Sequence, residues 1–358
     1  MNILSNKKKR KKLKKLKIIR VKNENAAKKK INLGIEFLRM ILSFLIILVH
    51  NFNPNRTKIQ SFPIKNLPYY VPFFMLISFY FSFNSLASRN TEKIKQRLIR
   101  ILFPYMGWPI IFWLHINRYN IFKGKVKIKN LYYQLLIGCG IYGVMWFLFN
   151  LLFISLFFTI IVFFFKKYFL IVLFIIEIFC YSFHYSKYNK KFWNQFHKIP
   201  VHHSIAPIPK NFLFSSTGFF LASENILNKY YKHRILVIFL SGSFLFIMLY
   251  RNYIHKINHI YKGIIIDLTG ISAFSLFSMI PFDKLNNKKI IFILKQITSY
   301  TGGVYYLHPK VAELFSVYSK YIRRRQFKGC IQLYLISYFI CFIGTNTFRK
   351  WNIKFLFN

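Results

Sequence analysis

The chain has 358 residues, of which 54% are hydrophobic and 20% aromatic, and it carries a formal net charge of +46. This composition is too apolar for an ordinary soluble domain and excludes that class. The charge would suit a nucleic-acid-binding protein, but most basic residues lie between long apolar runs, as loops between membrane spans do, so nucleic acid is excluded as the main partner.

The N-terminal segment 1–28 contains the densest basic cluster, NKKKRKKLKKLK at 6–17. It predicts a disordered cytoplasmic tail that sets the orientation of the chain and contacts anionic lipid. A nuclear-localisation signal or nucleic-acid patch is the alternative, which the apolar runs that follow disfavour. No Pro/Gly/Ser-rich linker divides residues 29–358, so we expect them to form one membrane domain.

Long apolar runs fill most of the remaining chain, and those at 147–165 and 169–180 have almost no polar face. Runs of this kind are typical of helices that span a bilayer. Since a span takes about 20 residues, the sequence predicts an all-α polytopic membrane protein with about ten transmembrane helices. The semi-apolar stretch 131–145 is expected to be interfacial or re-entrant. The expected spans are 32–52, 68–87, 98–117, 146–165, 168–186, 206–222, 234–250, 262–281, 290–309 and 331–348.

The basic loops give an orientation. A cytoplasmic tail and an even number of spans place both chain ends on the cytoplasmic side. Basic residues at 88–97 and 284–289 then lie inside, whereas those at 118–129 and 323–325 fall outside, so the positive-inside rule is only weakly obeyed. We expect a multi-pass protein with a cytoplasmic N-terminus, in the plasma membrane rather than an internal membrane.

The first expected span, GIEFLRMILSFLIILVH at 34–50, keeps three polar groups: Glu36, Arg39 and His50. Arg39 and His50 are eleven residues apart, about three helical turns, so they share one face and lie about 16 Å apart along the axis. Glu36 lies one turn before Arg39 and is expected to pair with it. The sequence favours a functional polar track facing the bundle interior. Snorkelling at the span edges is the alternative interpretation.

Five further segments accompany this pattern, and together they resemble acyltransferase family 3, polytopic membrane acyltransferases that typically O-acetylate sugars and glycans. The first span supplies R-x10-H with an acidic residue three positions before the arginine, and the other motifs follow in family order. Phe79 departs from the family pattern, because it follows Ser78 where glycine is usual, so local packing is expected to differ. The matching segments are PFFMLISFYF (72–81), KIKQRLIRILFPY (93–105), VMWFLFNLL (144–152), FLFSSTGFFLAS (212–223) and SYTGGVYYLHP (299–309).

The resemblance implies an enzyme that moves an acetyl group from cytoplasmic acetyl-CoA, or another acyl-CoA, to a hydroxyl of a carbohydrate or glycolipid. Attack by a hydroxyl needs a base, and histidine is the side chain best matched to that task near neutral pH. His50 is therefore the candidate general base, as the resemblance also implies. A covalent acyl-histidine relay is a lesser alternative, and a structural histidine at the span edge is another.

The arginines are candidates for binding the polyanionic donor. Arg97 and Arg100 lie one turn apart, and guanidinium groups suit phosphate because they are always charged and bidentate. Ordinary anchoring of the third span is the alternative role. Arg39 is expected to hold a CoA phosphate or pantetheine amide, or to stabilise charge on the thioester oxygen, and Glu36 to fix its orientation.

Other residues of the matching segments are weaker candidates for lining the acceptor or donor path. Trp146 equally fits an interfacial belt, and His308, expected on the same side as His50, equally fits a capping role. The full set is Ser78, Tyr80, Trp146, Tyr305 and His308.

We expect no metal site and no permanently bound cofactor. The four cysteines lack C-x-x-C spacing and resemble buried hydrophobes. The histidine cluster at 197–203 has no acidic residue near it, and Glu177 and Asp267 stay unassigned.

Two rival functions remain open. A non-enzymatic transporter or flippase of a glycan or lipid would also line its path with intramembrane polar groups. A degenerate acyltransferase fold that serves interaction or sensing is the third interpretation, and Phe79 is the departure that hints at it.

Overall fold

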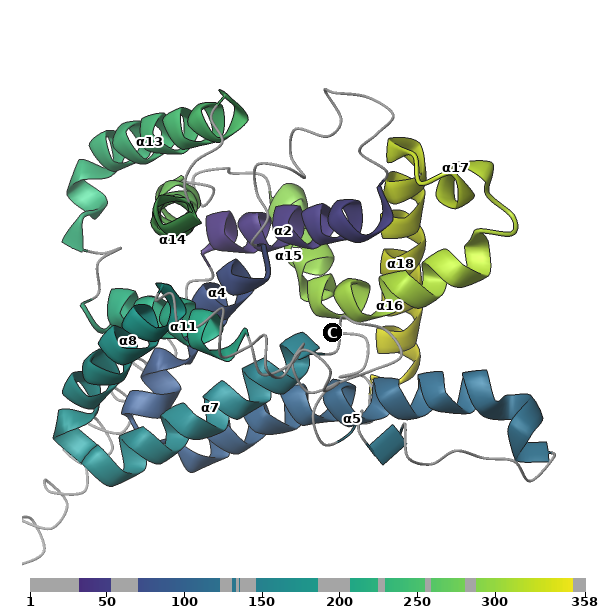
Figure 1. Cartoon of the computed structure of the whole chain (residues 1–358), viewed down its shortest axis with the longest axis horizontal. Helices are drawn as coiled ribbons and strands as arrows, with labels where there is room; N and C mark the ends of the chain where they lie inside the picture. The colour runs from purple at the N-terminus through teal and green to yellow at the C-terminus, as the bar shows by residue number, and fades with distance from the viewer. Residues whose placement is uncertain are drawn as a thin grey trace, which may run out of the picture.

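The computed structural model describes residues 32–52, 70–122, 131–132, 135, 146–185, 207–224, 229–254, 259–280 and 288–349. Within these ranges every regular element is a helix, which confirms the predicted all-α class (Figure 1). The helices are α2 (Leu33–Asn51), α4 (Tyr70–Ala87), α5 (Thr91–Phe122), α7 (Trp146–Phe165), α8 (Phe169–Tyr185), α11 (Ile208–Ser223), α13 (Arg234–Ile254), α14 (His259–Met279), α15 (Lys288–Ser299), α16 (Thr301–Phe315), α17 (Lys320–Arg323) and α18 (Phe327–Thr347), with the short 3-10 turns η1 (Lys166–Tyr168) and η2 (Tyr231–His233).

Helices occupy the positions of the ten predicted spans, and four helical segments of the described chain are long and apolar enough to cross a membrane. The longest of these contains two helices, α7 and α8, which η1 joins and which pack against each other. Lys166 in η1 has a φ of 46°, in the left-handed region, where the chain turns between them. The four segments are Leu33–Asn51, Thr91–His115, Trp146–Phe183 and Phe327–Thr347.

Large apolar side chains remain exposed on the outer helices. Phe179 of α8 is 70% exposed, and Ile235 and Phe246 of α13 are 78% and 70% exposed. Faces this apolar suit contact with lipid rather than water. Together with the apolar length of the helices, they indicate a multi-pass membrane protein.

Helix α4 packs against α2, α7 and α11 at the centre of the described bundle (Figure 1). Its contact with α11 is the closest, because Gly218 of α11 lies against the main chain of Leu76. Phe79 of α4 is fully buried, and its ring lies 4.6 Å from that of Phe158 of α7. The Phe79 ring, at a position where the family that the sequence resembles usually has glycine, therefore fills the aromatic core, and Gly218 supplies a close helix approach on the neighbouring helix.

The ninth predicted span, 290–309, is not one continuous helix, because α15 ends at Ser299 and α16 begins at Thr301. Three hydroxyl side chains around Tyr300 donate to the carbonyl three residues earlier: Thr298 to Lys295, Ser299 to Gln296 and Thr301 to Thr298. Such side-chain bonds compete with the helical ladder. The break gives α16 its own direction, beside α2 and α18.

Candidate active site

A cavity of about 460 Å³ lies between α2, α4, α5, α7 and α16. Its lining divides into three chemical groups. Four basic side chains come from α2 and α5, hydroxyl and amide groups from α4, α5 and α16, and aromatic rings from α4, α7 and α16. These groups are Arg39, Lys93, Arg97 and Arg100; Ser78, Ser82, Ser85, Gln96 and Thr301; and Phe74, Phe81, Phe147, Tyr305 and Tyr306.

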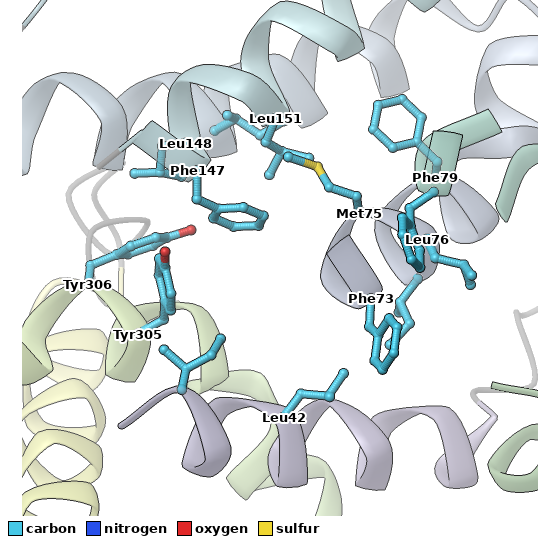
Figure 2. Close-up of a cluster of buried hydrophobic side chains, with 14 of the residues drawn as sticks. Leu42, Phe73, Met75, Leu76, Phe79, Phe147, Leu148, Leu151, Tyr305 and Tyr306 are labelled. Carbon is cyan, nitrogen blue, oxygen red and sulfur yellow. The ribbon is translucent and has the colours of Figure 1, made fainter. Parts of the chain in front are cut away.

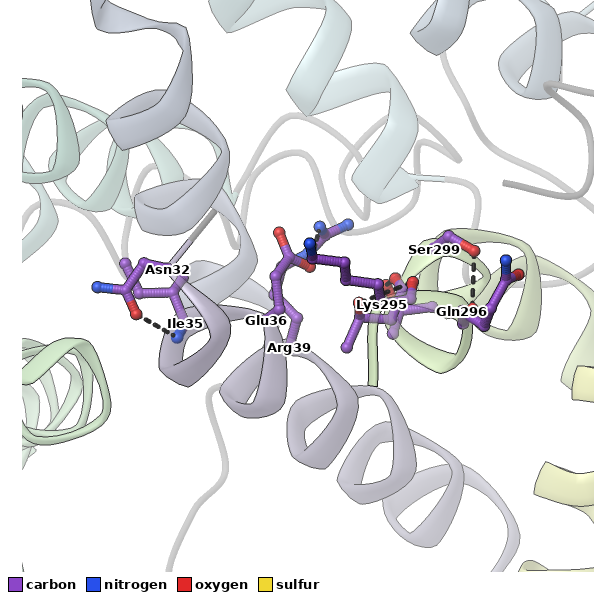
Figure 3. A network of polar contacts seen from close by, with 9 residues as sticks. Asn32, Ile35, Glu36, Arg39, Lys295, Gln296 and Ser299 are labelled. Carbon is purple, nitrogen blue, oxygen red and sulfur yellow. Dashed lines mark hydrogen bonds and ion pairs between the residues drawn. The ribbon is translucent and has the colours of Figure 1, made fainter. Parts of the chain in front are cut away.

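Arg39 reaches this cavity from the N-terminal half of α2. Its Nη1 lies 2.8 Å from Oε2 of Glu36, which confirms the predicted pairing one turn apart. Asn32 begins the helix, because its side chain accepts from the main-chain N–H of Ile35 at 3.2 Å. Figure 3 shows the Glu36–Arg39 pair with residues of α15 beside it. The carboxylate thus holds the guanidinium at the cavity wall.

Arg97 is tied to two other helices. Its Nη1 donates to the main-chain oxygen of Ser78 at 3.1 Å, and its Nη2 donates to Oγ of Ser78 at 3.1 Å and of Ser155 at 3.4 Å. Its guanidinium carbon also lies 5.0 Å from the centroid of the Phe79 ring. These contacts use several of the donors expected to bind phosphate. Arg97 therefore joins α5 to α4 and α7 at the cavity wall.

Replacing Arg97 by lysine is expected to destabilise the protein by about 2 kcal/mol, because one ammonium cannot reproduce a fork of bonds to Ser78 and Ser155. Thermal unfolding of the purified protein measures the change. Ser155→Ala, which removes only the longest bond, is the matched control and should cost less than about 1 kcal/mol. Equal losses of stability in the two variants would show that the hydrogen bonds of Arg97 do not hold the three helices together.

The aromatic part of the cavity is built around Tyr305 of α16. Its ring centroid lies 5.3 Å from that of Phe147 and 5.4 Å from that of Tyr306, and both tyrosines are buried. Figure 2 shows the two tyrosine hydroxyl groups close together beside the Phe147 ring. This end of the cavity is thus an apolar wall that carries two hydroxyl groups.

His50 lies at the C-terminal end of α2, where it does not line the cavity, and its side chain is exposed. Its ring centroid lies 5.5 Å from that of His308, which is fully buried. His308 comes three residues after Tyr305 on α16, so one helix connects the cavity wall to the histidine pair. Both Arg39 and His50 turn toward α16, as their shared helix face predicts.

Three predicted path residues, Tyr80, Trp146 and His308, do not line the cavity. Tyr80 is half-buried and packs against Phe274 of α14, with ring centroids 5.0 Å apart. It follows Ser78 by two residues, and on a helix that step turns a side chain away from its neighbour's face. Trp146 is half-buried at the start of α7, and Phe147 beside it faces the cavity instead.

Several lining residues were missed by the sequence reading, although their spacing carried a signal. Ser82 and Ser85 follow the predicted Ser78 at steps of four and three residues, which makes a polar stripe on the otherwise apolar helix α4. Lys93 and Gln96 share the helical spacing of Arg97 and Arg100 on α5. The position of Tyr306 could not be predicted from spacing. The turn at Tyr300 sets the direction of α16, and this direction decides which of its side chains face the cavity.

Glu177 and the described cysteines lie apart from the cavity. Glu177 accepts from Thr217 Oγ1 at 3.3 Å between α8 and α11. Cys330 and Cys341 are buried, as expected of small hydrophobes, and Cys180 is half-buried. The tail 1–28, Cys139 and the histidine cluster at 197–203 lie outside the described residues, as does most of 131–145.

The amino-acid sequence matches a known protein family over nearly its whole length. The sequence profile of acyltransferase family 3, described as an acyltransferase domain, matches residues 32–353. No curated protein and no solved structure matches the chain. The match extends over nearly the whole sequence, including every helix that contributes to the cavity.

Proposed function

The chain belongs to acyltransferase family 3, and we propose that it is a membrane-embedded O-acyltransferase that moves an acetyl group from cytoplasmic acetyl-CoA to a hydroxyl of a carbohydrate or glycolipid. The family makes the chain an acyltransferase, and the cavity supports the choice of donor. Four basic side chains line a cavity whose other wall, on α16, leads to the histidine pair.

The basic part of the cavity suits a polyanionic donor. Arg39, Lys93 and Arg100 line it from two helices, beside the tethered Arg97. Charge-assisted hydrogen bonds to phosphate are among the stronger polar contacts in proteins. In a CoA thioester the phosphates and the acyl group lie at opposite ends of a long arm. When the basic side chains bind the phosphates, this arm can extend along the cavity and place the acyl group near Tyr305.

We assign the acyl transfer itself to the pair of histidines, His50 and His308. His50 takes the proton from the acceptor hydroxyl as its oxygen attacks the thioester carbon. The new carbon–oxygen bond forms, the carbon–sulfur bond breaks, and the CoA sulfur leaves as a thiolate that the protonated His50 then protonates. The Tyr305 hydroxyl stabilises the negative charge on the thioester oxygen, while Arg39, about 16 Å from His50 along α2, binds a phosphate of the donor. Ser78 holds Arg97 at the wall, and Glu36 orients Arg39.

The membrane arrangement is part of the proposal. We assign about ten spans, a cytoplasmic N-terminus and the plasma membrane, with residues 1–28 as a basic tail and 29–358 as the membrane domain. Arg39 lies near the start of α2, and Lys93 near the start of α5. With the N-terminus inside, the basic part of the cavity faces the cytoplasm, where acetyl-CoA is made available.

Replacing Lys93 and Arg100 together by alanine is expected to raise the KM for acetyl-CoA about 10-fold or more, because each lost phosphate contact costs about 1–2 kcal/mol. The KM for the acceptor should stay unchanged. Initial rates with the purified protein in lipid nanodiscs measure both constants. Lys232→Ala in η2, outside the cavity, is the matched control. If the substitutions changed only the KM for the acceptor, Lys93 and Arg100 would not be binding acetyl-CoA.

Binding of acetyl-CoA also separates the enzyme from its main rival. A transporter or flippase that uses the same polar track has no need of a CoA donor. Saturable acetyl-CoA binding that the Lys93 and Arg100 substitutions weaken supports the enzyme, whereas an absence of binding and of acetyl-CoA hydrolysis supports the transporter.

A further inference from the structure

The buried imidazole of His308 has a fixed hydrogen-bonding pattern. Its Nδ1 lies 2.7 Å from the main-chain oxygen of Tyr305. A carbonyl oxygen only accepts, so Nδ1 carries the proton and Nε2 carries a lone pair. Within the described part of the chain, Nε2 is buried and has no hydrogen-bond partner. An unsatisfied acceptor in a fully buried side chain is costly, so it calls for an explanation.

The sequence Tyr305-Tyr306-Leu307-His308-Pro309 explains why this pattern is fixed. In an α-helix the carbonyl of Tyr305 would accept from the main-chain N–H of residue 309. Proline has no N–H, so Pro309, which lies inside α16, leaves that carbonyl available to the His308 ring. The helix itself therefore selects the His308 tautomer.

We propose that His308 is a positioning residue that sets the tautomer of His50. The two rings lie 5.5 Å apart between centroids, with an angle of 33° between their planes. Because Nε2 of His308 only accepts, the His50 nitrogen that meets it must carry the proton, and the opposite His50 nitrogen is left as the base. The hydrogen bond forms when the rings close in the complex with substrate, as catalytic contacts often tighten on binding.

This inference rests on the proposed function and refines it. In many enzymes a carboxylate orients the catalytic histidine, and the same task falls here to a second histidine. Among the described carboxylates, Glu36, Glu177 and Glu313 are bonded elsewhere, to Arg39, Thr217 and Lys310. The acceptor available to His50 is therefore the lone pair on Nε2 of His308 in α16.

The test compares His308→Leu, which removes the acceptor, with His308→Gln, whose side-chain oxygen restores one. His308→Leu is expected to lower kcat about 10- to 100-fold, as the loss of an orienting partner typically does, with the KM for acetyl-CoA unchanged. His308→Gln should recover most of kcat. Wild-type kcat in His308→Leu, or no recovery in His308→Gln, would overturn the proposal.

A second measurement does not depend on activity. Nitrogen-15 NMR of histidine-labelled protein reports the tautomer of His50, assigned by comparison with a His50 variant. With acetyl-CoA bound, one tautomer is expected in the wild type and a mixture in His308→Leu, and equal tautomer populations in both would overturn the inference. If the wild type showed the fixed tautomer but no acyl transfer, the proposed function would fail while the His308–His50 contact stood.

Discussion

Replacement of His50 by alanine is expected to reduce acyl transfer at least about 100-fold, because a positioned general base contributes about that factor or more to proton transfer. The side chain is exposed at the end of α2, so its loss should leave the fold intact. Mass spectrometry of surface glycans and glycolipids, from cells with the wild-type or variant protein, measures the effect. A difference of one acyl group identifies the acyl chain and the acceptor together.

His233→Ala is the matched control for this substitution. His233 is also exposed, but it lies in η2, whereas His50 lies at the end of α2 beside His308. This variant should transfer the acyl group at the wild-type rate and insert normally into the membrane. Undiminished transfer by His50→Ala would remove His50 as the base and direct attention to the Tyr305 hydroxyl.

Gly218→Ala is expected to destabilise the protein by about 3 kcal/mol or more. A methyl group at this position would collide with the main-chain oxygen of Leu76. Main-chain atoms of a helix cannot rotate out of the way, so α11 and α4 would have to separate along their contact. Thermal unfolding in detergent, followed by intrinsic tryptophan fluorescence, measures the change.

The matched control is Gly242→Ala on α13. A methyl group there would meet only Cδ1 of Leu276 at 3.8 Å, an ordinary van der Waals contact. Alanine also has a higher helix propensity than glycine, so this variant should be as stable as the wild type or slightly more stable. If Gly218→Ala unfolded at the same temperature as Gly242→Ala, the close α4–α11 contact would be wrong.

Local spacing made much of the helical bundle and part of the site predictable. Long apolar runs indicated helices at each expected span, since a helix is the way an isolated apolar segment satisfies its main chain in a bilayer. The spacing of Glu36, Arg39 and His50 placed them on one face of the helix. The ion pair between Glu36 and Arg39 confirms that these two residues are neighbours on that face. These features depend on helical geometry within one segment.

Other features could not be read from a single segment. Tyr80 and Ser78 share a matching motif, yet Ser78 lines the cavity whereas Tyr80 packs on α14. Arg97 and Arg100 looked equivalent, but Arg97 is bound by Ser78 and Ser155 from two other helices. Which neighbour a helix face meets depends on tertiary packing, and no spacing rule contains it.

The sequence by itself determined the helices, the shared face of Arg39 and His50, and the resemblance to the family. Only the tertiary structure decided which faces meet. It placed Phe79 in the aromatic core, turned α16 at Tyr300, and brought His308 to His50 across 258 residues of sequence. The physical reason is that helix periodicity is set by local hydrogen bonds, whereas contacts between helices are set by side-chain volumes that meet only in the folded bundle.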